Sequence, residues 1–226
     1  MEENNSPQCA RCNIKISERI CRTEGGKHPA NCPTVHHHDF NEEILEKYQQ
    51  EGSFEFARQA SLQEKDGYAN RERGYALVRP AKPRIEEISD FISRMNYQNI
   101  GLAFCMGLRK EAGIVEKYFG SKGLNMISAI CKVGGVEKQF LGLQDDEKIA
   151  AGSKESMCNP ILQAELLNQQ KTDFNVLLGL CVGHDSLFFK HSKAPCTVLA
   201  VKDRVTGHNP LAAVYTLDSY YRALNS

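Results

Sequence analysis

Short apolar runs alternate with helix-like stretches from residue 97 onward, and this alternation constrains the fold more than any other feature of the sequence. Parallel strands need a crossover between them, and a helix usually supplies it. The pattern therefore predicts an α/β domain with a four-stranded parallel sheet and flanking helices, of the Rossmann-like or flavodoxin-like type. The predicted strands cover residues 100–105, 124–131, 174–181 and 197–201.

The amino-terminal residues 1–35 have a different character, because they contain four cysteines and no apolar periodicity. The cysteines follow the pattern Cys9-x2-Cys12-x8-Cys21-x10-Cys32. Such a segment cannot build a hydrophobic core alone, and thiolates are strong ligands for soft and borderline metals. We predict a small knuckle in which the four thiols hold a metal ion or cluster. His28 could replace one of the thiols as a ligand, although it ranks below them.

Residues 36–82 are predicted to form a helical connecting segment before the α/β domain of residues 83–226. Apolar residues recur at helical spacing on both sides of Gly52, which indicates two short amphipathic helices. Residues 79–83, with two prolines, are expected to be a linker, and Pro83 is expected to open the next helix.

The composition of the chain limits which partners we expect it to bind and in which cellular compartment we expect it. Lys plus Arg and Asp plus Glu number 28 each, so no overall field favours a nucleic acid or an anionic membrane. The sequence begins without a secretory signal and contains no apolar stretch long enough to span a bilayer. We therefore expect a cytoplasmic protein in which the nine cysteines serve metal or thiol chemistry rather than disulfides. The sequence does not indicate an oligomeric state.

A second group of cysteines follows from the predicted strands. Cys105, Cys131 and Cys181 end three of them, and Cys158 precedes a helix. Strand carboxyl ends and helix amino termini share one edge of a parallel sheet, where ligands bind. Each cysteine taken singly reads as an ordinary buried residue. The set favours a second metal or cluster site, whereas Cys196, at the opposite edge, is assigned to the core.

Polar residues are expected at the same edge, after the third and fourth strands. His184, Asp185 and His208 are candidate catalytic groups. Lys202, Arg204 and Asn209 are candidates for binding an anionic substrate. The alternative is structural: Asp185 and Asn209 would cap helices, and the charged residues would form surface pairs. Two Asn-Pro pairs, at Asn159 and Asn209, are expected to begin helices.

Several stretches resemble an uncharacterised family of small cysteine-rich proteins, found mostly in anaerobic microbes and carrying a domain-of-unknown-function label. They are CARC, the later NCP, IGLAFCMGLRKEA, CNPILQAELLN, GLCVGHDSLF and VKDRVTGHNPLAA. The resemblance covers the knuckle and nearly all of the α/β part. It implies metal binding, without an established reaction, and an anaerobic setting would favour iron–sulfur chemistry over zinc.

Two thiol sets in one small chain lead to an iron–sulfur hypothesis, with one or two clusters of the [4Fe-4S] type. The knuckle cluster would accept electrons from a ferredoxin or flavoprotein and relay them to the strand-edge site. If only three cysteines bind there, an open iron could activate a small-molecule substrate, as in a reductase or desulfurising lyase. One alternative is a zinc-stabilised binding or metal-delivery module without redox activity. Another is thiol chemistry at Cys181 or Cys105.

Overall fold

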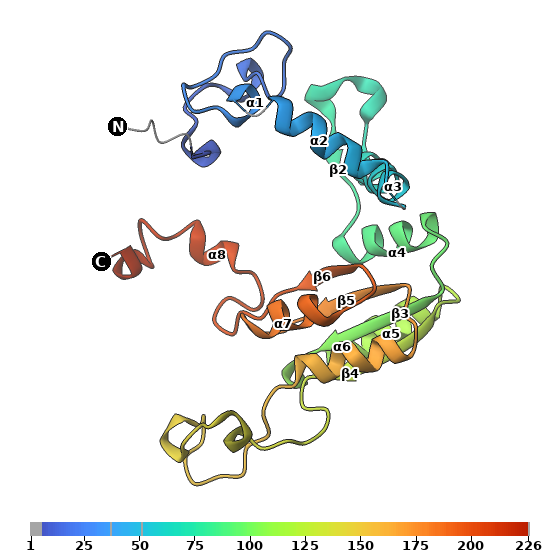
Figure 1. The fold of residues 1–226 in the computed structure, drawn as a ribbon, viewed down its shortest axis with the longest axis vertical. Coiled ribbons are helices and arrows are strands. Elements are labelled where there is room, and N and C mark those ends of the chain that lie inside the picture. The colour runs from blue at the N-terminus through green and yellow to red at the C-terminus, as the bar shows by residue number, and fades with distance from the viewer. Residues whose placement is uncertain (1–5, 37, 51, 226) are drawn as a thin grey trace. The chain divides into compact units, whose positions relative to one another are not determined.

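The computed structural model describes residues 6–36, 38–50 and 52–225, with only the backbone of His38, Asp39 and Asn225. Contacts between residues group the chain into two compact units, Met1–Leu62 and Gln63–Ser226 (Figure 1). The domain boundaries expected from the sequence at residues 35 and 82 stay predictions. In the described ranges, no helix combines the length and the apolar character needed to cross a membrane.

The first unit consists of short turns followed by two longer helices. Its elements are the 3-10 turns Cys9–Arg11 and Ile16–Glu18, α1 (Pro33–His36), α2 (His38–Tyr48) and α3 (Ser53–Asp66), the last of which runs on into the second unit. The prediction of two helices on either side of Gly52 is confirmed. Gly52 has φ of +74°, a left-handed conformation that suits glycine between two helices.

Almost nothing is buried in this unit. Among its described side chains, Cys32 alone is buried, with 9% of its surface exposed. The apolar residues Phe40, Leu45 and Phe54 are all more than half exposed. Arg19 supports the cysteine-rich loops by donating hydrogen bonds to the carbonyls of Cys12 and Ile14, each at 2.8 Å. The described residues of this unit therefore form no hydrophobic core that could hold residues 6–36 in place.

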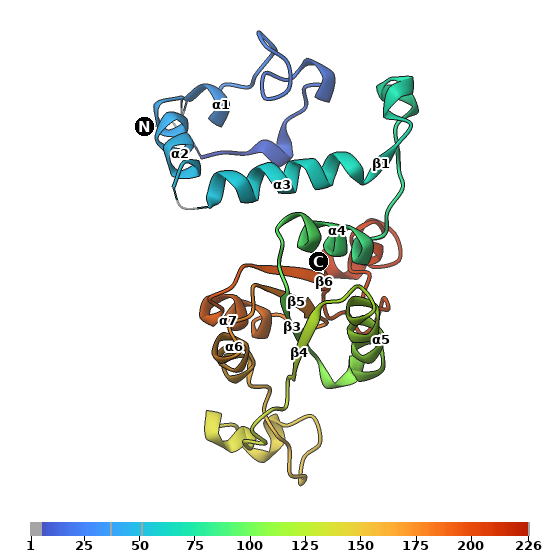
Figure 2. The ribbon, with the colours of Figure 1, turned by 90° about the vertical axis from the view of Figure 1, so that its right-hand side faces the viewer.

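The second unit is built on four parallel strands in the order β4-β3-β5-β6. This confirms the predicted α/β class. Figure 2 shows the sheet between α5 on one face and α6 with α7 on the other. The elements are α4 (Arg84–Arg94), β3 (Asn99–Phe104), α5 (Arg109–Gly120), β4 (Asn125–Ile130), α6 (Pro160–Gln169), β5 (Phe174–Leu178), α7 (His184–His191) and β6 (Cys196–Ala200).

The core lies on both faces of the sheet, and its largest side chains are fully enclosed. They include Phe119 of α5, Phe188 of α7 and Leu167 of α6, each with 0% of its surface exposed. Gly101 of β3 lets α6 and β5 approach closely: a Cβ atom there would lie 2.0 Å from Asn175 Oδ1. Cys196, at the amino end of β6, packs partly buried against this core, as expected.

Three sequence expectations for this unit are wrong. Residues 79–83 are not a simple linker, because β2 (Arg79–Pro80) pairs antiparallel with β1 (Tyr68–Ala69). The third strand stops at Leu178 instead of residue 181, since Gly179 turns the chain with φ of +67°. The last helix, α8 (Leu211–Val214), is only one turn long and is capped by Pro210, not by the Asn209 side chain.

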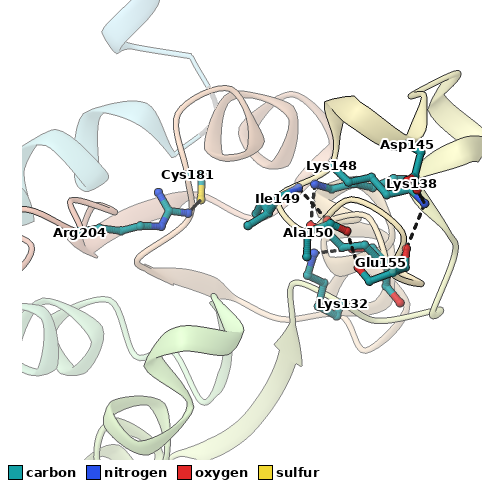
Figure 3. A network of polar contacts seen from close by, with 11 residues as sticks. Lys132, Lys138, Asp145, Lys148, Ile149, Ala150, Glu155, Cys181 and Arg204 are labelled. Atoms are coloured by element: carbon teal, nitrogen blue, oxygen red, sulfur yellow. Dashed lines mark hydrogen bonds and ion pairs between the residues drawn. The ribbon is translucent and has the colours of Figure 1, made fainter.

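Residues 132–157 leave the sheet as an excursion between β4 and α6. Two 3-10 turns, Lys138–Leu141 and Asp145–Glu147, lie within it. Its base is closed by a bridge between Glu137 and Ser156 and by the ion pair Lys138–Glu155, with 2.6 Å between nitrogen and oxygen (Figure 3). The tip carries exposed apolar side chains, among them Phe140 and Ile149.

The two Asn-Pro pairs give a matched test of capping. The Asn159 side chain accepts a hydrogen bond from the Leu162 amide at 3.1 Å, whereas Asn209 makes no such bond at α8. We expect Asn159→Ala to lower the free energy of unfolding by about 1 kcal/mol, and Asn209→Ala by less than about 0.5 kcal/mol. Urea denaturation of both variants measures the difference. Equal losses would contradict the assigned cap.

Candidate metal centres

The strand order places a topological switch point between β3 and β5. From β3 the chain moves to β4 on one side of the sheet, and from β5 it moves to β6 on the other. A crevice for ligands forms at the carboxyl ends of the two strands at such a point. Cys105 directly follows β3 and Cys181 follows β5 by three residues, so each side of the switch point carries one cysteine.

Cys131 occupies the middle of a group of three cysteines at this edge. Its amide donates to the Phe104 carbonyl at 2.8 Å, next to Cys105, and its own carbonyl accepts from the Asn159 amide at 2.8 Å, next to Cys158. Its sulfur accepts a hydrogen bond from the Met106 amide at 3.2 Å. With 3% of its surface exposed, Cys131 is the most buried of the three.

The surroundings shift the pKa values of these three thiols in different directions. Hydrogen bonding to Cys131, with further contributions from the Gly107 amide and Lys202, lowers the pKa of Cys105 to about 5. Hydrogen bonding to Cys131, with the charges of Lys132 and His184, lowers the pKa of Cys158 to about 6. The pKa of Cys131 itself is raised by its hydrogen bonds to both neighbours and by burial. These interactions favour the thiolate forms of Cys105 and Cys158 and the neutral form of Cys131.

Cys181 has a different partner. Figure 3 shows the Arg204 guanidinium directed at the Cys181 sulfur, with 3.1 Å between Nη2 and Sγ. This contact raises the pKa of Arg204, and the charges of Cys105 and Cys158 contribute in the same direction. Lys202, Arg204 and Lys132 thus supply positive charge to an edge that carries four thiols.

The remaining predicted site residues have distinct surroundings. The Nδ1 atom of His184, at the start of α7, is buried without a hydrogen-bond partner in the described structure. Asp185 accepts from the amide of Ser186 at 2.8 Å, which is a local turn contact. The Nδ1 atom of His208 lies 3.1 Å from the Asp203 amide nitrogen and 3.2 Å from the Val201 carbonyl oxygen, within its own loop. Asn209 is exposed.

The chain matches the family described as "Protein of unknown function (DUF1847)" over residues 32–199. It belongs to the DUF1847 family. An uncharacterized protein of Methanocaldococcus jannaschii, MJ0455, is 41% identical to it over 214 residues, which cover 95% of each chain. The family match contains Cys105, Cys131, Cys158 and Cys181, and it starts at the last cysteine of the amino-terminal set.

That amino-terminal set surrounds a cavity in this DUF1847 protein. The cavity has a volume of about 60 Å³. Its lining includes Arg19, Lys27 and all four cysteines of the set, Cys9, Cys12, Cys21 and Cys32. The predicted thiols are therefore brought together around one space. His28 is not among the lining residues, and its Nδ1 lies 3.2 Å from the Pro29 carbonyl oxygen.

The donor set of both centres suits a thiolate-bound metal group. In the described part of the chain, no three Cys, His, Asp or Glu side chains are grouped so that they could hold a single metal ion. A cluster carries its thiolates on separate irons, so its ligands lie further apart than those of one ion. The unpartnered Nδ1 of His184 beside the strand-edge thiols is consistent with a polar group that completes the site.

Two contributors to the strand-edge centre are not evident in the sequence. Lys132 adds positive charge near Cys158, and its Nζ also donates to the Ser156 carbonyl at 2.5 Å. Gln163 of α6 is fully buried, and its side-chain nitrogen donates to the carbonyls of Ala129 and Phe104. A glutamine on the apolar face of a predicted helix could have indicated this role, because a buried side-chain amide needs specific hydrogen-bond partners.

Proposed function

We propose that this DUF1847 protein is an iron–sulfur redox protein with two thiolate-bound centres. The amino-terminal centre, held by Cys9, Cys12, Cys21 and Cys32, accepts electrons from a ferredoxin or flavoprotein and relays them. The second centre, at the carboxyl edge of the sheet, acts on a small molecule in a reduction or a desulfurising elimination. Its ligands are drawn from Cys105, Cys131, Cys158 and Cys181.

The observation that carries this proposal is the convergence of thiols and cations at the switch point. Thiolates bind soft and borderline metals, and here two of them are stabilised before any metal arrives. The positive charges of Lys132, Lys202 and Arg204 offset the negative charge of a cluster with thiolate ligands. Four ligands from separate elements at a ligand-binding edge suit a reactive centre better than a closed structural zinc site.

The amino-terminal unit supports a metal for a different reason. Among its described side chains the one buried residue is a cysteine, and the cavity beside that cysteine is lined by the other three. Small modules of this kind draw their folding free energy from the bound metal. The cavity lining alone suits a cluster or a zinc ion.

The carboxyl edge of β3 and β5 is where the substrate would bind. Lys202 and Arg204 would attract an anionic group, with Asn209 as a further polar contact. His184 would supply a proton, because its unpartnered ring nitrogen lies beside the thiols. Asp185 and His208 are weaker candidates for this role, since both bond within their own loops. A cytoplasmic location would keep the thiols reduced and available as ligands.

Metal analysis of protein purified without oxygen tests the proposal. We expect a brown protein with roughly eight irons and eight sulfides per chain, the content of two four-iron clusters. Absorption and paramagnetic-resonance spectra should change on reduction with dithionite. A colourless protein with about one zinc per chain would contradict the redox function and support the zinc-stabilised binding module.

A further inference from the structure

We propose that the outer edge of β4 is a dimer interface, at which two copies of this chain join their sheets about a twofold axis. The two β4 strands would run antiparallel, and two four-stranded sheets would become one continuous sheet. The inference goes beyond the proposed redox function and is independent of it, because no metal ligand takes part in the interface.

The outer edge of β4 carries backbone groups that can accept a further strand. The strand lies at one end of the sheet and pairs with β3 alone in the ranges that the structure describes. The amides of Asn125 and Cys131 donate toward the β3 side, at 2.9 and 2.8 Å, so alternate residues face β3. The backbone groups of Met126, Ser128 and Ile130 therefore point away from the sheet. Apart from the Ile130 carbonyl, which accepts from the following turn, they have no backbone partner among the described residues.

This edge lacks the features that keep an exposed strand from pairing. Residues 125–130 contain no charged residue and no proline, and the β3–β4 register runs without a bulge. The opposite edge, β6, is covered: Arg84 of α4 donates to the Thr197 hydroxyl at 2.8 Å and to the Val198 carbonyl at 3.4 Å. The contrast indicates that β4 is the edge at which the sheet can be extended.

A hollow beside this edge leaves room for a second copy. It has a volume of about 630 Å³ and is lined by residues of β4 and of α5, which stands next to β4 in Figure 2. The lining includes Met126 and the α5 residues Gly113, Ile114 and Gly120. A Cβ atom at either glycine would meet nothing within 4 Å. Another helix can therefore approach α5 closely at these two positions.

The surface is complementary to itself about one twofold axis. Ser128 Oγ donates to Glu116 Oε2 at 3.2 Å, which places Glu116 of α5 beside the middle of β4. In the dimer the two α5 helices run antiparallel, so an axis close to Ser128 brings Glu116 of each copy to Lys117 of the other. The same axis sets Gly113 of one α5 opposite Gly120 of the other, because the two pairs share one midpoint. All four residues line the hollow. Opposite charges meet and small residues face each other, which identifies a second copy of this chain as the occupant.

Charge reversal in the full chain tests this pairing. Sedimentation of wild type at micromolar concentration should give twice the chain mass of 25.3 kDa. Lys117→Glu and Glu116→Lys each bring like charges together twice per dimer, and each should weaken association at least about tenfold. The double variant restores opposite charges and should recover to within about threefold of wild type. Glu111→Lys, a reversal on the exposed surface of α5 outside the hollow, should leave association unchanged.

Three results would overturn the inference. One is a wild type that stays monomeric, which would leave the β4 edge available to a strand of another protein. Another is a double variant that associates no better than the single variants. The third is a loss of association in Glu111→Lys as large as that in Lys117→Glu, which would trace the effect to charge in general.

Hydrogen exchange identifies the strand at the interface. The amides of Met126, Ser128 and Ile130 should exchange at least about tenfold more slowly in wild type than in Lys117→Glu at the same concentration. Amides of β6 should exchange alike in both. A dimer whose residues 124–131 exchange as fast as in Lys117→Glu would refute pairing at β4. Neither measurement depends on bound metal, so a colourless zinc protein would contradict the redox function and leave the dimer interface standing.

Discussion

Replacing Gln163 with leucine is expected to weaken metal binding at the strand-edge centre by about 10- to 100-fold, the usual cost of losing a group that orients metal ligands. The Gln163 side-chain nitrogen lies 2.7 Å from the Ala129 carbonyl oxygen and 3.3 Å from that of Phe104. Phe104 directly precedes Cys105 and Ala129 lies two residues before Cys131, so one side chain of α6 bonds to the ends of both β4 and β3. Leucine fills a similar volume but cannot donate a hydrogen bond to either carbonyl.

Asn175 provides the matched control for this prediction. It is also fully buried, but its side chain bonds to Thr172 and Ser192, at 2.8 and 2.9 Å, near the amino edge of the sheet. We expect Gln163→Leu and Asn175→Leu each to lower the free energy of unfolding by about 1–3 kcal/mol, because each leaves buried polar groups without partners. Competition with a chelator should reveal weaker metal binding in Gln163→Leu alone. Equal weakening in both variants would mean that general stability, not the position of the cysteines, controls the site.

The unpartnered Oε1 atom of Gln163 strengthens this interpretation. A buried carbonyl without a donor costs about 1–3 kcal/mol, so an apolar residue would serve packing alone at lower cost. The residue is therefore better explained by the two hydrogen bonds that it donates than by the space that it fills.

Emptying the amino-terminal centre is expected to expose the first unit to proteases. Cys32→Ser removes one of the proposed ligands and the one described side chain that is buried in this unit. Metal binding in such modules contributes on the order of 10 kcal/mol to folding, and no hydrophobic core replaces it here. Brief trypsin treatment should cut the first unit of Cys32→Ser at least about tenfold faster than that of wild type, while residues 84–200 stay intact.

His28→Ala is the control for this experiment, because His28 lies between two of the cysteines without lining their cavity. We expect its cleavage rate and metal content to match wild type. Faster cleavage of His28→Ala would identify the histidine as a ligand. Unchanged cleavage of Cys32→Ser would show that the first unit is held by something other than its thiols.

The strands could be predicted from the sequence because each is a short apolar run between helical stretches, and the residues that follow such strands must share one edge. The convergence of Cys105, Cys131 and Cys181 follows from that rule alone. The contact between Arg204 and the Cys181 sulfur does not, because it depends on a guanidinium from the loop after β6. The hydrogen bonds of Gln163 could not be predicted either. A helical pattern shows that a side chain faces the core, but not which carbonyls it bonds to.

The β1–β2 pairing was missed, and Asn209 was wrongly expected to cap α8, for a related reason. Proline at position 80 argued for a linker, yet a two-residue edge ribbon tolerates proline. At Asn209 the Asn-Pro pair had the chemistry of a helix start but was followed by only one helical turn. Local sequence signals mark where an element can begin, whereas its length is set by what it packs against.

The excursion of residues 132–157 separates two cysteines in sequence while keeping their backbones in contact. Its base is closed by the Glu137–Ser156 bridge and the Lys138–Glu155 ion pair, and residues 139–153 lie between these contacts. Because both closing contacts lie outside residues 139–153, we expect a change in the length of this stretch to leave the positions of Cys131 and Cys158 unchanged. The same property makes it the natural position for inserting a fluorescent reporter or an affinity tag in the intact protein.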